Sequence, residues 1–468
     1  MTEVADPSSR PRPARAPRRS PTELAVTFLD RPFVEALVAE RGEPGWLRDD
    51  RLAALTAFES LEVESNRLYT PYLDLRAARI EDAAPYTAVA VTPTGTGDLP
   101  AGVAALVEIR EDGVAAVALD EAARAAGVRV LPLAALVRTD EVFARSLLDG
   151  GSILPADEKL AQLSRAAWSQ GIVVHIPANV RVERPIVLRW AVGAARTLVG
   201  RTFIVLDDGA QASVVEELVQ SDEVVAGAYG LLSATTEIRL GANARLAMAS
   251  LQELGPDHVA FQQRLARIGE GADLRWALAQ LGARLVRSRV DNVLAGDRST
   301  VEQVEIVFGI GDQLHDLTSY TRHQGRDTTG QLLAKGVLMD NARSYMKGLI
   351  SIEKTAIGTD SYLGEFGMNL SKHSRAVAIP SLEIDQPDCR RAMHSSSVGP
   401  IDESQLFYLE SRGIAPDEAR KFIVLGFLEP VVARVPLEDA QDRLREALEA
   451  KWAAGIGIGT IGGGSAAA

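Results

Sequence analysis

Apolar positions recur with two different periods along this chain, and the change of period divides it into three parts. In residues 26–61 they fall three and four apart, with Gly42 between two such stretches, which predicts two helices. In residues 171–399 they form short β-branched runs instead, such as Thr202–Leu206 and Thr300–Phe308. Runs of this length between small-residue turns predict strands. Helical spacing then returns toward the C-terminus.

Turns of similar sequence separate the predicted strands at a regular spacing. Three Gly-Ala turns follow one another about 30 residues apart, at Gly209, Gly241 and Gly271. Later turns follow at about half that distance, at Asn341, Ile357 and Ser374. A strand–turn repeat sustained over this length is typical of a solenoid.

We therefore predict a mainly β fold whose core, residues 171–400, is a right-handed parallel β-helix flanked by N-terminal and C-terminal helical regions. The turns contain little of the Asn-Gly or Asp-Gly sequence that closes antiparallel hairpins. A large antiparallel β-sandwich is the alternative, although its turns would be less alike. We expect the helical ends to cover the open strand edges, which would otherwise template aggregation.

The regions around the predicted β-helix differ in composition. Residues 1–20, rich in Pro, Arg and Ser, predict a disordered tail, and residues 21–170 predict a helical and small α/β region. Residues 401–454 predict a C-terminal helical region, followed by a flexible tail at 455–468. The last helix carries one apolar stripe, made of Leu437, Ala440, Leu444, Leu448 and Trp452. Because this stripe is longer than a terminal helix needs for its own packing, we expect it to bind a partner. The alternative is that it packs on the end of the β-helix.

Composition narrows the classes of protein that this chain can belong to. Hydrophobic residues make up 46% and aromatic residues 5%, so the core must be mainly aliphatic. The net charge of -13 argues against nucleic acid as a partner. No apolar run approaches the ~20 residues of a membrane span, and no secretory signal is present, so we expect a cytoplasmic protein without a membrane partner. With Cys389 as the one cysteine, neither a disulfide nor a four-cysteine metal site can form within the chain.

Candidate chemistry is concentrated in one stretch. The chain has no phosphate-binding loop, so we expect it to bind no ATP, and it has neither a Gly-x-Ser-x-Gly nor an HExxH motif. Residues 380–399 contain a thiol, an imidazole and several carboxylates, which together could bind a soft or borderline metal. These side chains are Glu383, Asp385, Asp388, Cys389 and His394. The alternative is a polar last coil that contains a Cys and a His by chance.

Several motifs in one order resemble the SufB/SufD family of iron–sulfur cluster assembly scaffold proteins. They are Gly336–Ser344, Gly348–Ala356, Gly358–Tyr362, Ile379–Ile384, Gln405–Ile414 and Gly426–Val431. The strong match runs from Gly336 to Trp452, and the N-terminal helices are similar to those of SufD-type members. The resemblance implies a β-helix with helical ends, no enzymatic activity, and a role in iron acquisition and cluster assembly.

The resemblance also implies partners and a site. The partners would be a SufB-type subunit and a SufC-type ATPase, the latter docked on the C-terminal helices. His394 occupies the position of a His implicated at the SufB–SufD interface, so it is the candidate iron ligand, shared with the partner chain. Cys389 is a weaker candidate for binding the transient, shared iron–sulfur cluster. Many relatives carry a Cys two residues before that His, where this chain has Ala392. Having one cysteine, the chain is most similar to SufD.

Other functions and assemblies stay open at this point. The chain could be a SufB-like scaffold that acts alone, and a homodimer is as compatible with the sequence as a heterodimer. A β-helix carbohydrate-active enzyme is the alternative from a different class. Such an enzyme needs a cluster of carboxylates or basic side chains on an exposed sheet, and it would leave the C-terminal helices without a purpose.

Overall fold

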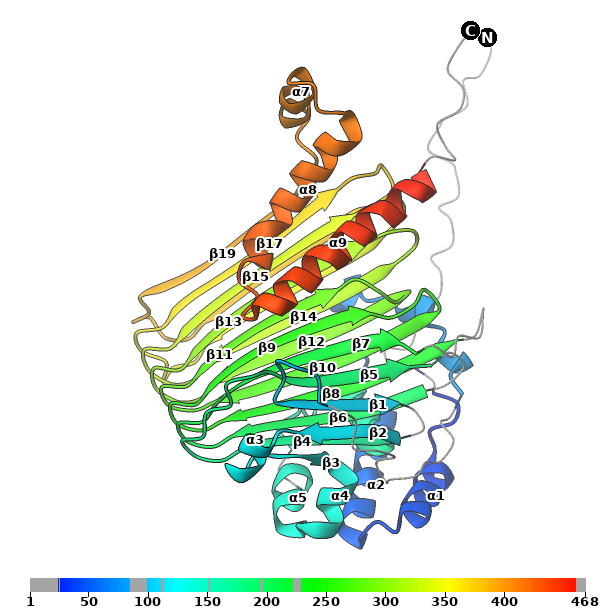
Figure 1. The fold of residues 1–468 in the computed structure, drawn as a ribbon, viewed down its shortest axis with the longest axis vertical. Coiled ribbons are helices and arrows are strands. Elements are labelled where there is room, and N and C mark those ends of the chain that lie inside the picture. Colours follow the sequence, from blue (N-terminus) through cyan, green and yellow to red (C-terminus); the bar gives the residue numbers. More distant parts are fainter. Residues whose placement is uncertain are drawn as a thin grey trace, which may run out of the picture.

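Successive strands alternate between two sheets, so each strand pairs with the strand two places away in the chain (Figure 1). This computed structural model describes residues 24, 26–84, 99–110, 113–149, 152–193, 197–221 and 229–459. Sheet A contains, in spatial order, β2 (Gly113–Leu119), β1 (Ala105–Arg110), β5 (Ile186–Val192), β7 (Gln211–Gln220), β9 (Arg245–Glu253), β11 (Asp273–Gln280), β13 (Thr300–Gly309), β15 (Thr329–Leu338), β17 (Asp360–Asn369) and β19 (Arg391–Pro400). Sheet B contains β3 (Arg129–Pro132), β4 (Gln170–Ile176), β6 (Thr197–Leu206), β8 (Gly230–Leu240), β10 (His258–Ile268), β12 (Leu285–Leu294), β14 (Leu314–His323), β16 (Arg343–Ile352) and β18 (Arg375–Ile384).

Among strands β4 to β19 every pairing is parallel, which confirms the predicted parallel β-helix and excludes the β-sandwich. Leu285, Leu314 and Arg343 are register partners on adjacent strands, so one coil of two strands takes about 29 residues here. The predicted spacing of about 30 is therefore one whole coil, and the spacing of 16 to 17 is half a coil. Asn341 and Ser374 lie in turns before strands of sheet B, whereas Ile357 lies in a turn before a strand of sheet A.

One turn of every coil contains a residue in the left-handed conformation, and these residues stack in a column. Their φ values lie between 56° and 77°, at Asn179, Gly209, Asn243, Gly271, Arg298, Asp327 and Gly358. Each amide donates to a carbonyl in the turn of the next coil, as Gly209 N does to Ala242 O at 2.8 Å. The predicted equivalence of Gly209 and Gly241 is wrong, because the residue in the column is Asn243. Asn, like Gly, adopts this conformation readily.

The N-terminal region closes the first coil. β2 runs antiparallel to β1, and β3 antiparallel to β4, so each sheet ends in a reversed strand. Helices α1 (Arg31–Arg41), α2 (Gly45–Ser60), α4 (Leu133–Thr139), α5 (Glu141–Leu148) and α6 (Lys159–Ala167) join one apolar cluster with the outer side of sheet B. The remaining short helices are η2 (Thr70–Tyr72), η3 (Leu75–Ala78), η4 (Ile80–Asp82) and α3 (Glu121–Ala125). The predicted tail at residues 1–20 lies outside the described residues.

Up to residue 459, where the described residues end, the C-terminal region has three helices, α7 (Glu403–Ser411), α8 (Pro416–Val432) and α9 (Glu438–Gly459). The apolar stripe of α9 is buried: Leu444, Leu448 and Trp452 share one cluster with Ile306 and Phe308 of sheet A. The expectation that this stripe is free to bind a partner is therefore wrong. α9 also continues five residues into the predicted tail, and residues 460–468 lie outside the described residues.

The expectation that the helices cover the last strand edges is wrong as well. α8 and α9 lie along the outer side of sheet A (Figure 1) and leave β18 and β19 largely accessible to solvent. No helix in the described part of the chain is both long and apolar enough to cross a membrane.

Candidate functional site

The last coil is the open end of the solenoid. β18 and β19 are the final strands of the two sheets, so each has one edge without a neighbouring strand. Their side chains are mostly half-exposed or exposed, in contrast to the buried strands before them. Three large apolar side chains face solvent here: Ile384 is 46% exposed, Met393 50% and Val398 40%. An exposed apolar edge invites pairing with another chain.

The structure brings His394 and Cys389 to this end of the lumen. His394 is the register partner of Leu363 on β17 and is exposed. Because register partners on parallel strands point to the same side, the imidazole lies on the lumen side of β19. Cys389 is a free, half-buried thiol in the turn before β19, packed against the cluster that contains Leu363 and Ile350. Both candidates therefore lie at the last coil: His394 is exposed on β19, and Cys389 is half-buried in the turn before it.

The carboxylates predicted with them do not complete a metal site. Glu383, Asp385 and Asp388 are exposed. In the part of the chain that the structure describes, no three His, Cys, Asp or Glu side chains lie together in a way that could hold a metal ion. An iron ion at His394 would therefore take its other ligands from solvent or from a second chain. Arg391 pairs with Asp360 at 2.6 Å and fixes the start of β19.

A second exposed apolar surface lies on the C-terminal helices. α7 has no buried residue and stands away from the sheets (Figure 1). Asp402 caps this helix by accepting from Ser404 N at 2.8 Å. Its aromatic residues Phe407 and Tyr408 are 73% and 56% exposed, and Phe422 of α8 is 64% exposed. We call Phe407, Tyr408 and Phe422 the aromatic surface.

Comparison with known proteins identifies the family. A family model described as SUF system FeS cluster assembly, SufBD core domain, matches residues 190–427, more than half of the chain. The chain belongs to the SufBD family. The matched residues begin in β5 and end in α8, so they include the open end and the aromatic surface.

Curated relatives of this SufBD-family chain point the same way. The iron-sulfur cluster assembly protein SufD of Bacillus subtilis (strain 168) is 27% identical over 447 residues, which cover 92% of this chain and 99% of that protein. A SufBD family protein of Staphylococcus epidermidis (strain ATCC 12228 / FDA PCI 1200) is 27% identical over 313 residues, 66% of either chain. These findings confirm the resemblance read from the sequence and the connection with iron–sulfur cluster assembly.

The lumen of this SufBD-family chain contains polar side chains that sequence reasoning missed. Arg264 donates to Glu216 at 2.8 Å and to Gln262 at 2.6 Å, all inside the coil. Burial raises the pKa of Glu305 to about 7, against the opposing effects of Arg264 and Ser288. The signal in the sequence was the alternation of β13, which places Gln303 and Glu305 on the same side as Val301 and Val307.

Glu365 on β17 is a second lumen carboxyl, and its pKa is raised further than that of Glu305. Burial raises the pKa of this carboxyl to about 8; the backbone hydrogen bond from Ile379 lowers it, and the charge of Glu305 adds to the rise. The amide of Ile379 donates to Glu365 Oε2 at 2.9 Å. Two carboxyls thus lie in the lumen close to the open end.

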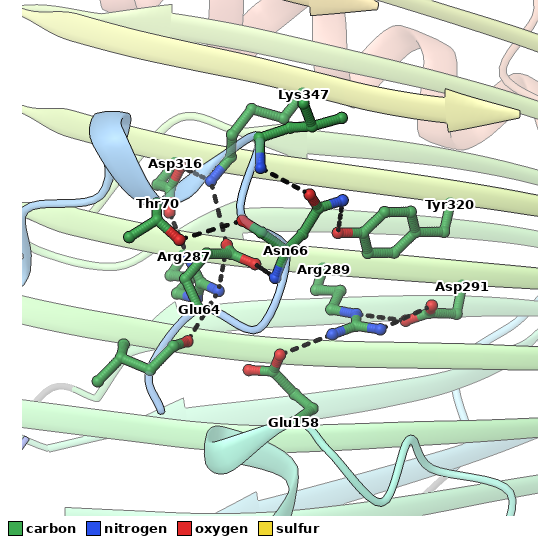
Figure 2. Close-up of polar contacts among 12 residues, drawn as sticks. Glu64, Asn66, Thr70, Glu158, Arg287, Arg289, Asp291, Asp316, Tyr320 and Lys347 are labelled. Atoms are coloured by element: carbon green, nitrogen blue, oxygen red, sulfur yellow. Dashed lines mark hydrogen bonds and ion pairs between the residues drawn. The ribbon is translucent and has the colours of Figure 1, made fainter. Parts of the chain in front are cut away.

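Charged side chains on the outer side of sheet B were missed too. They lie beneath the segment 61–70, as Figure 2 shows. Arg287 contacts Asp316 at 2.6 Å and Glu64 at 3.2 Å, and Lys347 contacts Asp316 at 2.5 Å. Burial acts to raise the pKa of Asp316, but the charges of Lys347 and Arg287 outweigh it and hold this pKa below its usual value. These four paired charges attach the N-terminal segment to the solenoid.

Proposed function

We propose that this SufBD-family chain is a non-catalytic, SufD-like scaffold subunit of a cytoplasmic iron–sulfur cluster assembly complex. The observation that carries the proposal is the open last coil, an apolar strand edge with His394 on its lumen side. The relative named SufD, aligned over 99% of its length, supports the SufD-like assignment. A single cysteine supports it as well, because thiolates for a cluster would have to come from another chain.

The partner at the open end is a SufB-type subunit. Its own strands can pair with the free edges of β18 and β19, with Met393 and Val398 buried between the two chains. A second copy of this chain is the alternative occupant of the same edge. Purification of the co-expressed subunits distinguishes the two assemblies by the composition of the complex.

The ATPase partner docks on the aromatic surface and not on the stripe of α9. Exposed aromatic side chains are the residues that contribute most to protein interfaces. Replacing Phe407 and Phe422 together with Ala should abolish capture of a SufC-type ATPase and leave the SufB-type subunit bound. Val142→Ala is the matched control, since Val142 is 83% exposed but lies on α5. Undiminished ATPase capture by the double variant would refute this docking site.

His394 binds iron transiently at the junction with the SufB-type subunit. A neutral imidazole is a competent iron ligand, and the partner supplies thiolate or carboxylate ligands. In a strain that depends on this system, His394→Ala should lower cluster production while the complex still assembles, and Cys389→Ala should change little. Wild-type cluster production by His394→Ala would show that this His has no role in iron binding.

A SufB-like scaffold acting alone is a distinguishable outcome. The isolated chain, reconstituted anaerobically with iron and sulfide, should hold no stable cluster, because it offers one thiol. A stoichiometric cluster on the isolated chain would favour the SufB-like alternative.

A further inference from the structure

Glu305 and Glu365 belong to one row of lumen positions that leads to the open end. Glu305 on β13 is in register with Ala334 on β15, and Ala334 is in register with Glu365 on β17. The next residue in the row is Ser396 on the last strand, β19. Adjacent strands are about 4.8 Å apart, so the two carboxyls are separated by two strand spacings with only a methyl group between them.

The small side chain of Ala334 leaves a cavity between the two carboxyls. The cavity measures about 20 Å³, and Glu305, Glu365, Gln303 and Ser319 are among its lining residues. A single water molecule needs roughly 10–15 Å³ and two to four polar partners. The cavity therefore has the size and the polar lining for one water.

Gly348 leaves room for two lumen side chains. A Cβ atom there would lie 2.5 Å from Leu363 Cδ2 and 2.7 Å from Glu365 Oε1, so a larger residue would displace one or both of them. Ile379 N donates to the other oxygen at 2.9 Å. Glu305 Oε1, in contrast, is buried and has no hydrogen-bond partner among the described residues. A buried carboxylate with an unpartnered oxygen costs far more free energy than a buried neutral carboxyl.

The basic side chains around the two carboxyls are already paired. Arg264, whose charge acts on Glu305, is bonded to Glu216. The ammonium of Lys347 is paired with Asp316 on the outer side of sheet B. Tyr69 approaches from outside and donates its phenol proton to Gly348 O at 2.9 Å. No described cation is thus left to neutralise two carboxylates in the lumen.

We propose that Glu305 and Glu365 form a proton-binding site in which both carboxyls, bridged by one water, still hold their protons at about pH 6, well above the range in which carboxyls usually ionise. The burial that raises both pKa values acts in the same direction. The site keeps the end of the lumen uncharged. A chain that docks on β18 and β19 then buries a neutral Glu365, which avoids the penalty of burying a charge. This second part rests on the proposed pairing of the open end with a SufB-type subunit.

Infrared titration of the full chain tests the proton site without any partner. The carbonyl band of protonated carboxyls should persist at pH 6 and disappear between about pH 7 and 8. Glu305→Gln and Glu365→Gln should each remove part of this late-titrating band and keep the fold, because glutamine resembles the neutral acid. Glu302→Gln is the matched control: Glu302 lies on the same strand but next to Arg434, 3.9 Å away on the outer side. Complete ionisation below about pH 5.5 would overturn the proposal.

The pH dependence of SufB-type subunit binding tests whether docking requires a neutral Glu365. Its dissociation constant should rise by up to about tenfold per pH unit above about pH 8 for the wild type, as expected when one proton is linked to docking. Glu365→Gln should lack this added pH dependence, and Glu302→Gln should retain it. Equal pH dependence in all three proteins would overturn the linkage to docking. If the SufB-type subunit binds at no pH, the proposed pairing fails, while the infrared result still decides the proton site.

Discussion

The sheets of the solenoid must terminate at both ends of the molecule, and the two ends differ in how the terminal strand edges are covered. At the N-terminal end, reversed strands β2 and β3 terminate the sheets, and helices cover sheet B, where the ion pair between Arg201 and Glu237 is fully buried. At the C-terminal end, β18 and β19 keep free edges, and ion pairs such as Arg391–Asp360 are accessible to solvent. The closed end contributes stability, whereas the open end keeps an apolar edge that is a hazard unless another chain covers it. We therefore expect substitutions at the closed N-terminal end to change stability, and substitutions at the open C-terminal end to change binding.

The largest expected difference concerns buried charge. Asp316→Ala leaves Arg287 and Lys347 buried with Glu64 as their remaining acidic partner, because all four are at most 3% exposed. Removing one partner of a buried pair costs about 3–5 kcal/mol. We expect this loss in the free energy of unfolding, measured by urea titration.

The control for this substitution lies at the open end. Asp360→Ala removes the partner of Arg391, whose side chain is 45% exposed. Exposed pairs contribute about 0–1 kcal/mol, so this variant should be close to wild type. Equal losses in the two variants would show that covering by the N-terminal segment 61–70 does not make the Asp316 pairs more important for stability than the exposed pair at the open end.

A slightly smaller loss of stability is expected for a substitution in the buried stripe of α9, and almost none for one on the exposed side of α8. Leu444 is 2% exposed in the cluster between α9 and sheet A, so Leu444→Ala should lower the free energy of unfolding by about 2–5 kcal/mol. Phe422→Ala, on the aromatic surface, should change it by less than about 0.5 kcal/mol. Thermal unfolding of the two variants measures both values. Marked destabilisation by Phe422→Ala would mean that this surface packs against the body of the protein.

The pH dependence of stability tests the lumen near the open end. Glu305 has a usual pKa of 4.5 and a folded-state pKa of about 7, so between these values the folded protein binds the extra proton. Its contribution to stability is fully present below pH 4.5 and is lost as pH rises to about 7, a loss of about 3 kcal/mol. Glu305→Gln should remove this part of the slope. An unchanged slope between pH 4.5 and 7 in urea titrations would count against a protonated lumen.

The sequence predicted the fold better than the details of its repeat. Because β-branched runs and small-residue turns are local signals, the strands from Thr202 and Thr300 were found. The exact repeat was not, because both Gly and Asn satisfy the left-handed turn and the similarity of Gly209 to Gly241 concealed the true partner, Asn243. The stripe containing Leu444 was found as an apolar face. The outer side of sheet A, against which this face packs, was not predicted, because sequence periodicity shows that a face is buried but not what covers it.

Of the candidate site, the sequence pointed to His394 but not to the buried acidic side chains. His394 was located by resemblance and lies on the last strand, β19. Its proposed role in iron binding stays a prediction. Glu305, Glu365 and Asp316 were not identified from the sequence. Glu305 and Glu365 lie in the lumen, and their register across three strands follows only from the coil structure. Asp316 is buried on the outer side of sheet B because the segment 61–70 covers it there. That covering depends on contacts across more than 200 residues, as between Glu64 and Arg287.

The smallest expected effect on stability is at the open edge itself. Met393 lies on β19 and is 50% exposed, so Met393→Lys should change the free energy of unfolding by less than about 0.5 kcal/mol. The same substitution places a charge on the free strand edge, a device by which natural proteins block edge-to-edge pairing. Capture of the SufB-type subunit, or self-association if the chain forms a homodimer, should therefore be lost. Val142→Lys on α5 should alter neither property. The expected loss concerns binding alone. If a stable Met393→Lys variant still pairs with another chain, the free edge of β19 is not the binding surface that the comparison of the two ends assigns to it.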